Sequence, residues 1–166
     1  MDPEGLVTAI IEIPQGSVNK YEFDQKTQRF RLDRVLYSPI HYPADYGFIP
    51  ETLAADGDPL DILVFISHPT FPGCEIPARI IGGLVMADEK GDDQKILSVA
   101  AVDPRFGDVD CLAKVPAHTL KEIEYFFSIY KDLEGKSCQV TGWLDRADAI
   151  ELWQQYRIRS EEPILT

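Results

Sequence analysis

Hydrophobic and polar residues alternate along much of the first hundred positions, the pattern that half-buried β-strands produce. The run at 5–14 is rich in β-branched residues and is stopped by a Pro-Gln-Gly turn. Residues 20–23 and 29–34 alternate on either side of a short polar connection, which predicts a hairpin. Residues 38–54 are rich in proline, tyrosine and glycine and are predicted to form an ordered loop. Further strands are predicted at about 61–66, 76–87 and 96–102.

The hydrophobic period lengthens to three or four residues in the last third of the chain. This predicts an amphipathic helix over roughly 117–132. A short strand at 138–143 precedes a second helix at about 146–158, for which Asp145 is a candidate N-cap. Residues 159–166 are expected to form a flexible tail.

Strands come first and helices last, without the strand-helix-strand alternation that builds a parallel doubly wound sheet. We therefore predict a mainly β, α+β fold, in which an antiparallel barrel carries two C-terminal-half helices on its outside. The length of 166 residues is suited to one domain over residues 1–166.

Net charge, the lack of long apolar runs and the cysteine spacing together limit the binding partners and the cellular location that the chain is expected to have. The formal net charge of −12 should repel nucleic acid and anionic membranes. No apolar run approaches the roughly 18 residues of a membrane span, and the acidic first residues do not resemble a secretory signal. Cys74, Cys111 and Cys138 are scattered, which argues against a disulfide framework or a zinc site and favours a reducing cytoplasm.

An acidic turn is the strongest chemical signal in the chain. Asp56-Gly57-Asp58-Pro59-Leu60-Asp61 places three carboxylates directly before the apolar run 62–66. Carboxylates packed so closely repel one another unless a hard cation such as Mg²⁺ lies between them. The residue spacing does not fit an EF-hand loop. A solvated acidic turn explains the segment about equally well when it is taken alone, because Asp and Gly favour turns.

A second acidic cluster, at 88–95, follows another strand-like apolar run. Two carboxylate clusters at strand ends are what a two-metal site uses, where bridging carboxylates hold neighbouring cations. A charged hairpin tip is the alternative for this segment.

Some charged residues fall where the alternation would place core residues, namely Glu12, Lys20, Glu22 and Arg34. They could lie on a barrel rim, where long side chains reach water. They could equally line a polar cavity in which carboxylates bind cations while Lys and Arg bind oxyanions.

Tyrosines also accumulate beside charged residues, at Tyr42, Tyr46 and Tyr130, the last of these next to Lys131. A buried tyrosine usually does no more than satisfy its hydroxyl within the core, so each of these alone is weak evidence for a site.

Taken together, these motifs resemble the family I soluble inorganic pyrophosphatases, in order and approximate spacing, from about residue 7 to 145. The length resembles the short bacterial or archaeal members. The matching motifs are Ile11-Glu12-Ile13-Pro14, Asn19-Lys20-Tyr21-Glu22, Leu32-Asp33-Arg34, Tyr42-Pro43 with Asp45-Tyr46-Gly47, Asp56 to Ile62, Asp88-Glu89 with Asp93 and Lys95, and Tyr130-Lys131-Asp132-Leu133-Glu134.

The resemblance implies a closed OB-like barrel and Mg²⁺-dependent hydrolysis of inorganic pyrophosphate to two orthophosphates. The reaction implied is in-line attack of a metal-activated water without a covalent intermediate, with Asp58 as the general base. The implied metal ligands are Asp56, Asp61, Asp93, Asp88 and Glu12. The implied substrate contacts are Lys20, Glu22, Arg34, Tyr46, Lys95, Tyr130 and Lys131, with Tyr42 and Glu89 in supporting places.

The same resemblance implies a cytoplasmic homohexamer in which Mn²⁺ or Zn²⁺ could replace Mg²⁺. Ca²⁺ is expected to inhibit, because it is larger and takes more ligands. The three histidines and three cysteines are given no role in the site.

Two rival functions are an OB-fold nucleic-acid binder, which the net charge disfavours, and a non-catalytic Ca²⁺ module. Inward-facing Lys20, Arg34 and Lys131 would have no purpose in the second.

Overall fold

The computed structural model describes residues 5–158, so the predicted tail at 159–166 lies outside the described residues. The strands are β1 (Leu6–Ile13), β2 (Asn19–Asp24), β3 (Arg29–Val35), β4 (Asp45–Ile49), β5 (Leu60–Phe65), β6 (Glu75–Asp88), β7 (Gly91–Ala100) and β8 (Gln139–Leu144). The helices are α1 (Ala117–Ile129) and α2 (Arg146–Tyr156), with short 3₁₀ turns at Pro104–Phe106, Leu112–Lys114 and Asp132–Glu134.

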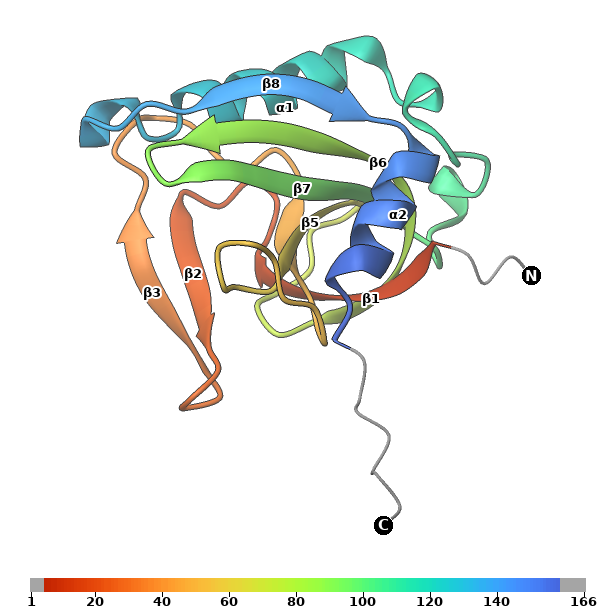
Figure 1. The fold of residues 1–166 in the computed structure, drawn as a ribbon, viewed down its shortest axis with the longest axis horizontal. Coiled ribbons are helices and arrows are strands. Elements are labelled where there is room, and N and C mark those ends of the chain that lie inside the picture. The colour runs from red at the N-terminus through yellow and green to blue at the C-terminus, as the bar shows by residue number, and fades with distance from the viewer. Residues whose placement is uncertain (1–4, 159–166) are drawn as a thin grey trace.

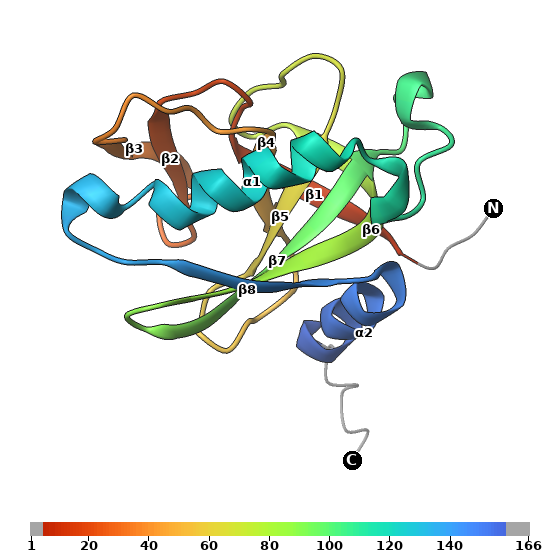
Figure 2. The same ribbon diagram turned by 90° about the horizontal axis from the view of Figure 1, so that it is seen from above.

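Five strands close into a ring, which confirms the predicted barrel. The hydrogen-bonded order is β1-β4-β5-β7-β6, the pairing of β1 with β6 completes the ring, and β8 extends it from β6. Pairings in this sheet are antiparallel except for β5 with β7, which run parallel. Both helices lie outside the ring, as Figures 1 and 2 show. No helix within residues 5–158 is long and apolar enough to cross a membrane.

Buried side chains form two clusters, one on each face of the ring strands. Along β5, Leu63 and Phe65 pack in the cluster that α1 covers, whereas Ile62 and Val64 pack in the cluster that includes Leu152 of α2. Because side chains alternate across a strand, β5 contributes residues to both clusters, and both of its faces are buried. The pattern expected for β5 is therefore a continuous apolar run, and its sequence has one.

Strand β4 was missed from the sequence, where residues 38–54 were predicted to be a loop. All five of its residues are buried, because it lies between β1 and β5 in the ring. It therefore shows no alternation, and its glycine and tyrosine resemble loop composition. Gly47 is required because a Cβ atom there would stand 1.8 Å from the carbonyl oxygen of Ile10 on β1.

The second acidic cluster also lies differently from the expectation. Strand β7 begins at Gly91 rather than near 96, and it pairs with the end of β6 through a tight turn in which Asp88 opposes Gly91. Asp92 and Asp93 are therefore strand residues, and the pleat fixes the direction of the Asp93 side chain.

The hairpin of β2 and β3 forms its own two-stranded sheet beside the barrel (Figure 1). The carboxylate of Glu12 on β1 accepts a hydrogen bond from the backbone N–H of Phe23 at 2.9 Å. The Phe23 ring stacks on Phe48 of β4, with centroids 5.7 Å apart. These contacts hold one face of the hairpin toward the mouth of the barrel.

Gly47→Ala tests the close approach of β1 and β4. The new Cβ would overlap the Ile10 carbonyl, so the strands must separate and the free energy of unfolding should fall by about 3 kcal/mol or more, measured by urea denaturation. Gly142→Ala on β8 is the control, because nothing lies within 4 Å of its new Cβ and the change should stay within about 0.5 kcal/mol. Equal stability of the two variants would contradict the packing described here.

Candidate active site

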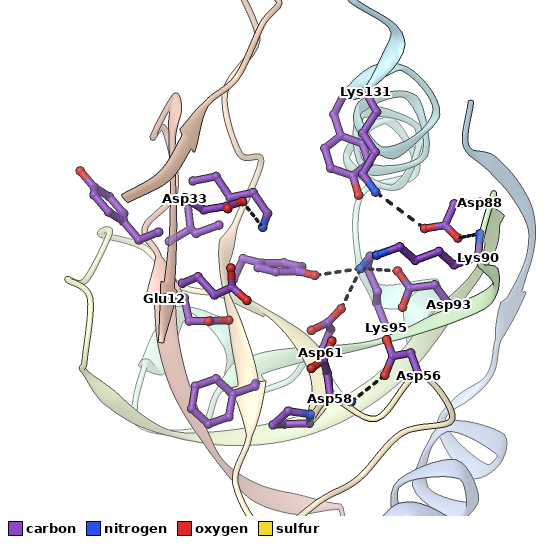
Figure 3. Close-up of a pocket in the computed structure, with 18 of the residues that line it drawn as sticks. Glu12, Asp33, Asp56, Asp58, Asp61, Asp88, Lys90, Asp93, Lys95 and Lys131 are labelled. Carbon is purple, nitrogen blue, oxygen red and sulfur yellow. Dashed lines mark hydrogen bonds and ion pairs between the residues drawn. The ribbon is translucent and has the colours of Figure 1, made fainter. Parts of the chain in front are cut away.

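A cavity of about 460 Å³ lies between the β2–β3 hairpin, the ends of β5 to β7 and the chain that follows α1 (Figure 3). Ten acidic and six basic side chains line it, so the cavity wall has a net negative charge. The acidic residues are Glu12, Glu22, Asp33, Asp56, Asp58, Asp61, Asp88, Glu89, Asp92 and Asp93. The basic residues are Lys20, Arg34, Lys90, Lys95, Lys131 and Lys136.

The fold brings together almost every residue that the sequence singled out. All the candidate catalytic, metal-binding and substrate-binding side chains line this one cavity, and Glu89 does as well. Tyr42 is the exception: it is buried behind the wall, with its ring 5.5 Å from that of Tyr46 and 4.8 Å from that of Phe126. Tyr42 therefore packs behind Tyr46, a residue that lines the cavity, and has no contact with the cavity itself.

Lys95 is the buried centre of the site, with only 2% of its surface exposed. Its Nζ donates to Asp61 Oδ2 and Asp93 Oδ2, both at 2.9 Å, and to the Tyr46 hydroxyl at 2.8 Å. The rings of Tyr46 and Phe127 lie about 5 Å from the same ammonium. Burial opposes its charge, but Asp61, Tyr46 and Asp93 outweigh burial and raise the pKa of Lys95 well above its usual range.

The pairing of β5 with β7 produces this contact. The two strands run parallel with Asp61 directly opposite Lys95, and Asp93 lies two residues before Lys95 on the same face of β7. Both carboxylates therefore converge on the ammonium from neighbouring strands, as Figure 3 shows.

The acidic turn lies at the rim of the cavity. Gly57 adopts a φ of +88°, in the left-handed region that favours glycine, and the Asp56 side chain accepts a hydrogen bond from the Asp58 N–H at 3.0 Å. Burial, then the neighbouring charges of Asp56 and Asp61, raise the pKa of Asp58. The turn thus holds Asp58 near like charges, which favour its protonated form.

Glu12 lies on the hairpin side of the cavity. Burial is the main reason why its pKa rises to about 7, and the N–H of Phe23 only partly offsets that effect. A cation bound beside Glu12 would favour its charged form.

Ion pairs hold three further basic groups at the cavity wall. Lys20 and Arg34 both contact Asp33, at 3.0 and 3.2 Å, while Lys131 lies 3.7 Å from Asp88. No role could be assigned to Asp33 from the sequence, although it lies inside the matching motif Leu32-Asp33-Arg34. Asp33 pairs with Lys20 of β2 and with Arg34 of its own strand, β3. These contacts depend on the hairpin register, in which Lys20 opposes Arg34, and the sequence alone does not give that register.

Lys90, Asp92 and Lys136 also line the cavity and were not singled out. Lys136 is only two residues beyond the last matching motif, whereas Lys90 lies in the turn between β6 and β7 and Asp92 at the start of β7.

The donor set suits hard divalent cations, because carboxylate oxygens are the ligands that Mg²⁺ and Ca²⁺ prefer. Among residues 5–158, no three acidic, histidine or cysteine side chains stand close enough together to enclose an ion as they are. Asp61 and Asp93 are turned to Lys95 instead, and Asp56 to a backbone N–H. Burial first, and neighbouring carboxylates second, raise the pKa of both Glu12 and Asp58, and a cation bound beside them would favour their charged forms.

Comparisons with known proteins identify the family. The family model described as inorganic pyrophosphatase matches residues 9–160. The inorganic pyrophosphatase of Halalkalibacterium halodurans is 54% identical over 147 residues, covering 89% of this chain and 90% of that protein. The inorganic pyrophosphatase of Methanosarcina mazei is 50% identical over 153 residues, covering 92% and 90%.

The fold comparison agrees. The crystal structure of inorganic pyrophosphatase from Thermus thermophilus matches with a TM-score of 0.89 and 45% identity, covering 93% of this chain and 90% of that chain. A match over most of the chain, together with relatives at about half identity, settles the family. The chain therefore belongs to the inorganic pyrophosphatase family, in the soluble family I group that its motifs resemble.

Proposed function

We propose that this protein hydrolyses inorganic pyrophosphate to two orthophosphates, in a reaction that requires Mg²⁺ and forms no covalent intermediate. The observation that carries the proposal is the cavity in which ten carboxylates and six basic side chains meet. A diphosphate needs both kinds of group, because carboxylates hold the cations and Lys and Arg hold the phosphate oxygens. The named relatives support the same activity.

The residues proposed to hold the cations are Asp56, Asp61, Asp93, Asp88 and Glu12, with Glu89 close by. When bound, Mg²⁺ lowers the pKa of water and offsets the charge of the substrate. Mn²⁺ or Zn²⁺ are possible replacements, and Ca²⁺ should inhibit because it takes more ligands in a looser geometry.

Asp58 is proposed to accept or orient the proton of the attacking water. Its place supports this role, because Asp58 lines the cavity next to Asp56 and Asp61, two of the proposed cation ligands. Its side chain makes no ion pair among the described residues and so faces the cavity without a fixed partner.

The groups proposed to hold the diphosphate come from three directions. The hairpin supplies Lys20, Glu22 and Arg34, the barrel supplies Tyr46 and Lys95, and the chain after α1 supplies Tyr130 and Lys131. Lys20 and Lys131 each pair with a single carboxylate, Asp33 and Asp88 respectively. An incoming phosphate oxygen could replace that carboxylate as the partner of an ammonium group that is already in position.

The acidic surface supports a small substrate brought in with cations rather than nucleic acid or a membrane as partner. A single domain acting in the cytoplasm remains our proposal for the organisation and location of residues 1–166.

Removal of divalent cations tests the reaction. Phosphate release from pyrophosphate should be rapid with millimolar Mg²⁺ and fall to background in excess chelator, because the carboxylates alone repel the substrate. The apparent melting temperature should also fall in chelator, since the cations bind the folded state preferentially. Full turnover in excess chelator would exclude the proposed chemistry.

Asp58→Asn tests the proton acceptor. The amide keeps the shape but cannot accept the proton, so turnover should fall about 100-fold or more at neutral pH. Mg²⁺ affinity, measured by calorimetry on the substrate-free protein, should change far less. Activity within a few-fold of the unmodified chain would show that another group is the base.

The quaternary structure is proposed to be a homohexamer. Large apolar side chains are exposed on the described surface, among them Tyr125 and Leu133 at 64% and Val102 at 71%, and burial in subunit contacts would remove them from water. Sedimentation velocity should give a particle near six times the chain mass of 18.7 kDa. A monomer at micromolar concentration would refute this assembly.

A further inference from the structure

The loop at 50–59, between β4 and β5, carries Asp56 and Asp58 and ends two residues before Asp61. The hydrogen bonds within its tip are few: Ala54 N–H donates to the Asp58 carbonyl at 2.8 Å, Gly57 N–H to the Ala54 carbonyl at 3.0 Å and Asp58 N–H to the Asp56 side chain at 3.0 Å. The tip is exposed. Something outside the tip must therefore fix where its carboxylates stand.

The buried hydroxyl of Thr52 joins the two ends of this loop. It donates to the Ile49 carbonyl, the last residue of β4, at 2.6 Å, and accepts from the Leu60 N–H, the first residue of β5, at 2.9 Å. Thr52 is only 3% exposed and does not line the cavity. One buried side chain, outside the cavity, thus fixes the distance between the two ends of the loop.

The chain that ends α2 holds Thr52 in turn. Leu53 N–H donates to the Tyr156 carbonyl and Ile158 N–H to the Glu51 carbonyl, both at 2.9 Å, and the two flank an antiparallel bridge between Thr52 and Arg157. Glu51 has a φ of +60°, a left-handed conformation that is uncommon for a residue other than glycine. The hydrogen bond to its carbonyl helps to keep that conformation in place.

Helix α2 is a firm anchor for this contact. Ala149 and Leu152 are buried in the cluster shared with the ring strands, and Trp153 and Tyr156 pack against it. The loop is therefore tied to the core through a segment about 100 residues away in sequence, and that segment carries no residue of the cavity.

We propose that Thr52 and the backbone of Tyr156 to Ile158 are positioning elements of the active site. They hold the 50–59 loop so that Asp56 and, through Leu60, Asp61 keep the spacing that cation binding needs, with Asp58 held beside them. The proposal rests on the proposed function only for the role of these carboxylates.

Thr52→Val tests the side chain, because valine has nearly the same shape but neither donates nor accepts. We expect Mg²⁺ binding to the substrate-free protein, measured by calorimetry, to weaken about tenfold, and the Leu60 amide to exchange its hydrogen faster. Thr52→Ser keeps the hydroxyl and should stay within about twofold of the unmodified chain.

Ser98→Ala is the matched control for the loss of a buried hydroxyl. Ser98 is fully buried and donates to the Leu63 carbonyl at 2.8 Å, outside the loop. It should lower the free energy of unfolding by about 1 kcal/mol while leaving Mg²⁺ affinity within about twofold. Equal loss of affinity in this control and in Thr52→Val would mean a general stability effect and would overturn the proposal.

Ile158→Pro tests the C-terminal contact independently, since proline removes the N–H that bonds Glu51. The side chain is more than half exposed, and Arg157, with ψ of 132°, already has the extended conformation required before proline. Mg²⁺ affinity should fall about threefold, whereas Ile158→Ala, which keeps the N–H, should leave it unchanged.

The two variant pairs separate this proposal from the proposed function. Mg²⁺ affinity equal to that of the unmodified chain in folded Thr52→Val, or in Ile158→Pro if the first does not fold, would overturn the positioning role. A wild-type chain that binds Mg²⁺ but releases no phosphate from pyrophosphate would overturn the proposed function, while the Mg²⁺ titrations would still measure the effect of the loop contacts.

Discussion

The contact of Lys95 with Asp61 and Asp93 is the constraint around which the site is built. Its ammonium is buried, so it persists only because two carboxylates and a tyrosine hydroxyl surround it at hydrogen-bond distance. Those partners come from β4, β5 and β7, and their meeting requires the parallel pairing of β5 with β7. Removing one carboxylate would leave the buried ammonium with a single ionic partner, which is more costly than loss of a surface pair.

Around the positive charge of Lys95, the rest of the cavity wall has more carboxylates than basic groups. The protein tolerates this by distributing the charge: Asp33 is shared by Lys20 and Arg34, Asp88 faces Lys131, and Glu12 has a raised pKa. Such a wall repels a free diphosphate. Bound divalent cations would offset this negative charge, and an acidic protein could then bind a highly charged anion.

The sequence predicts elements that have one exposed face, such as the hairpin and α1, and also β5, whose uninterrupted apolar run marks a strand buried on both faces. The carboxylate turn is contiguous and could be placed as well. β4 was missed because it is short, buried on both faces and contains a tyrosine and a glycine that resemble loop composition. The parallel pairing of β5 with β7 cannot be read from local pattern. The pairing of Asp33 depends on hairpin register. The contact between Thr52 and the chain after α2 is made mostly by backbone atoms, which leave no pattern in side-chain identity.

Cation-dependent capture of the anion is the central claim of this account. Calorimetric titration with a non-hydrolysable diphosphate, imidodiphosphate, measures it without turnover. The account predicts tight binding when Mg²⁺ is present and at least a hundredfold weaker binding in excess chelator, on the order of 3 kcal/mol in binding free energy. Binding of equal strength in both conditions would contradict it, because the basic side chains would then hold the anion without help from the carboxylates.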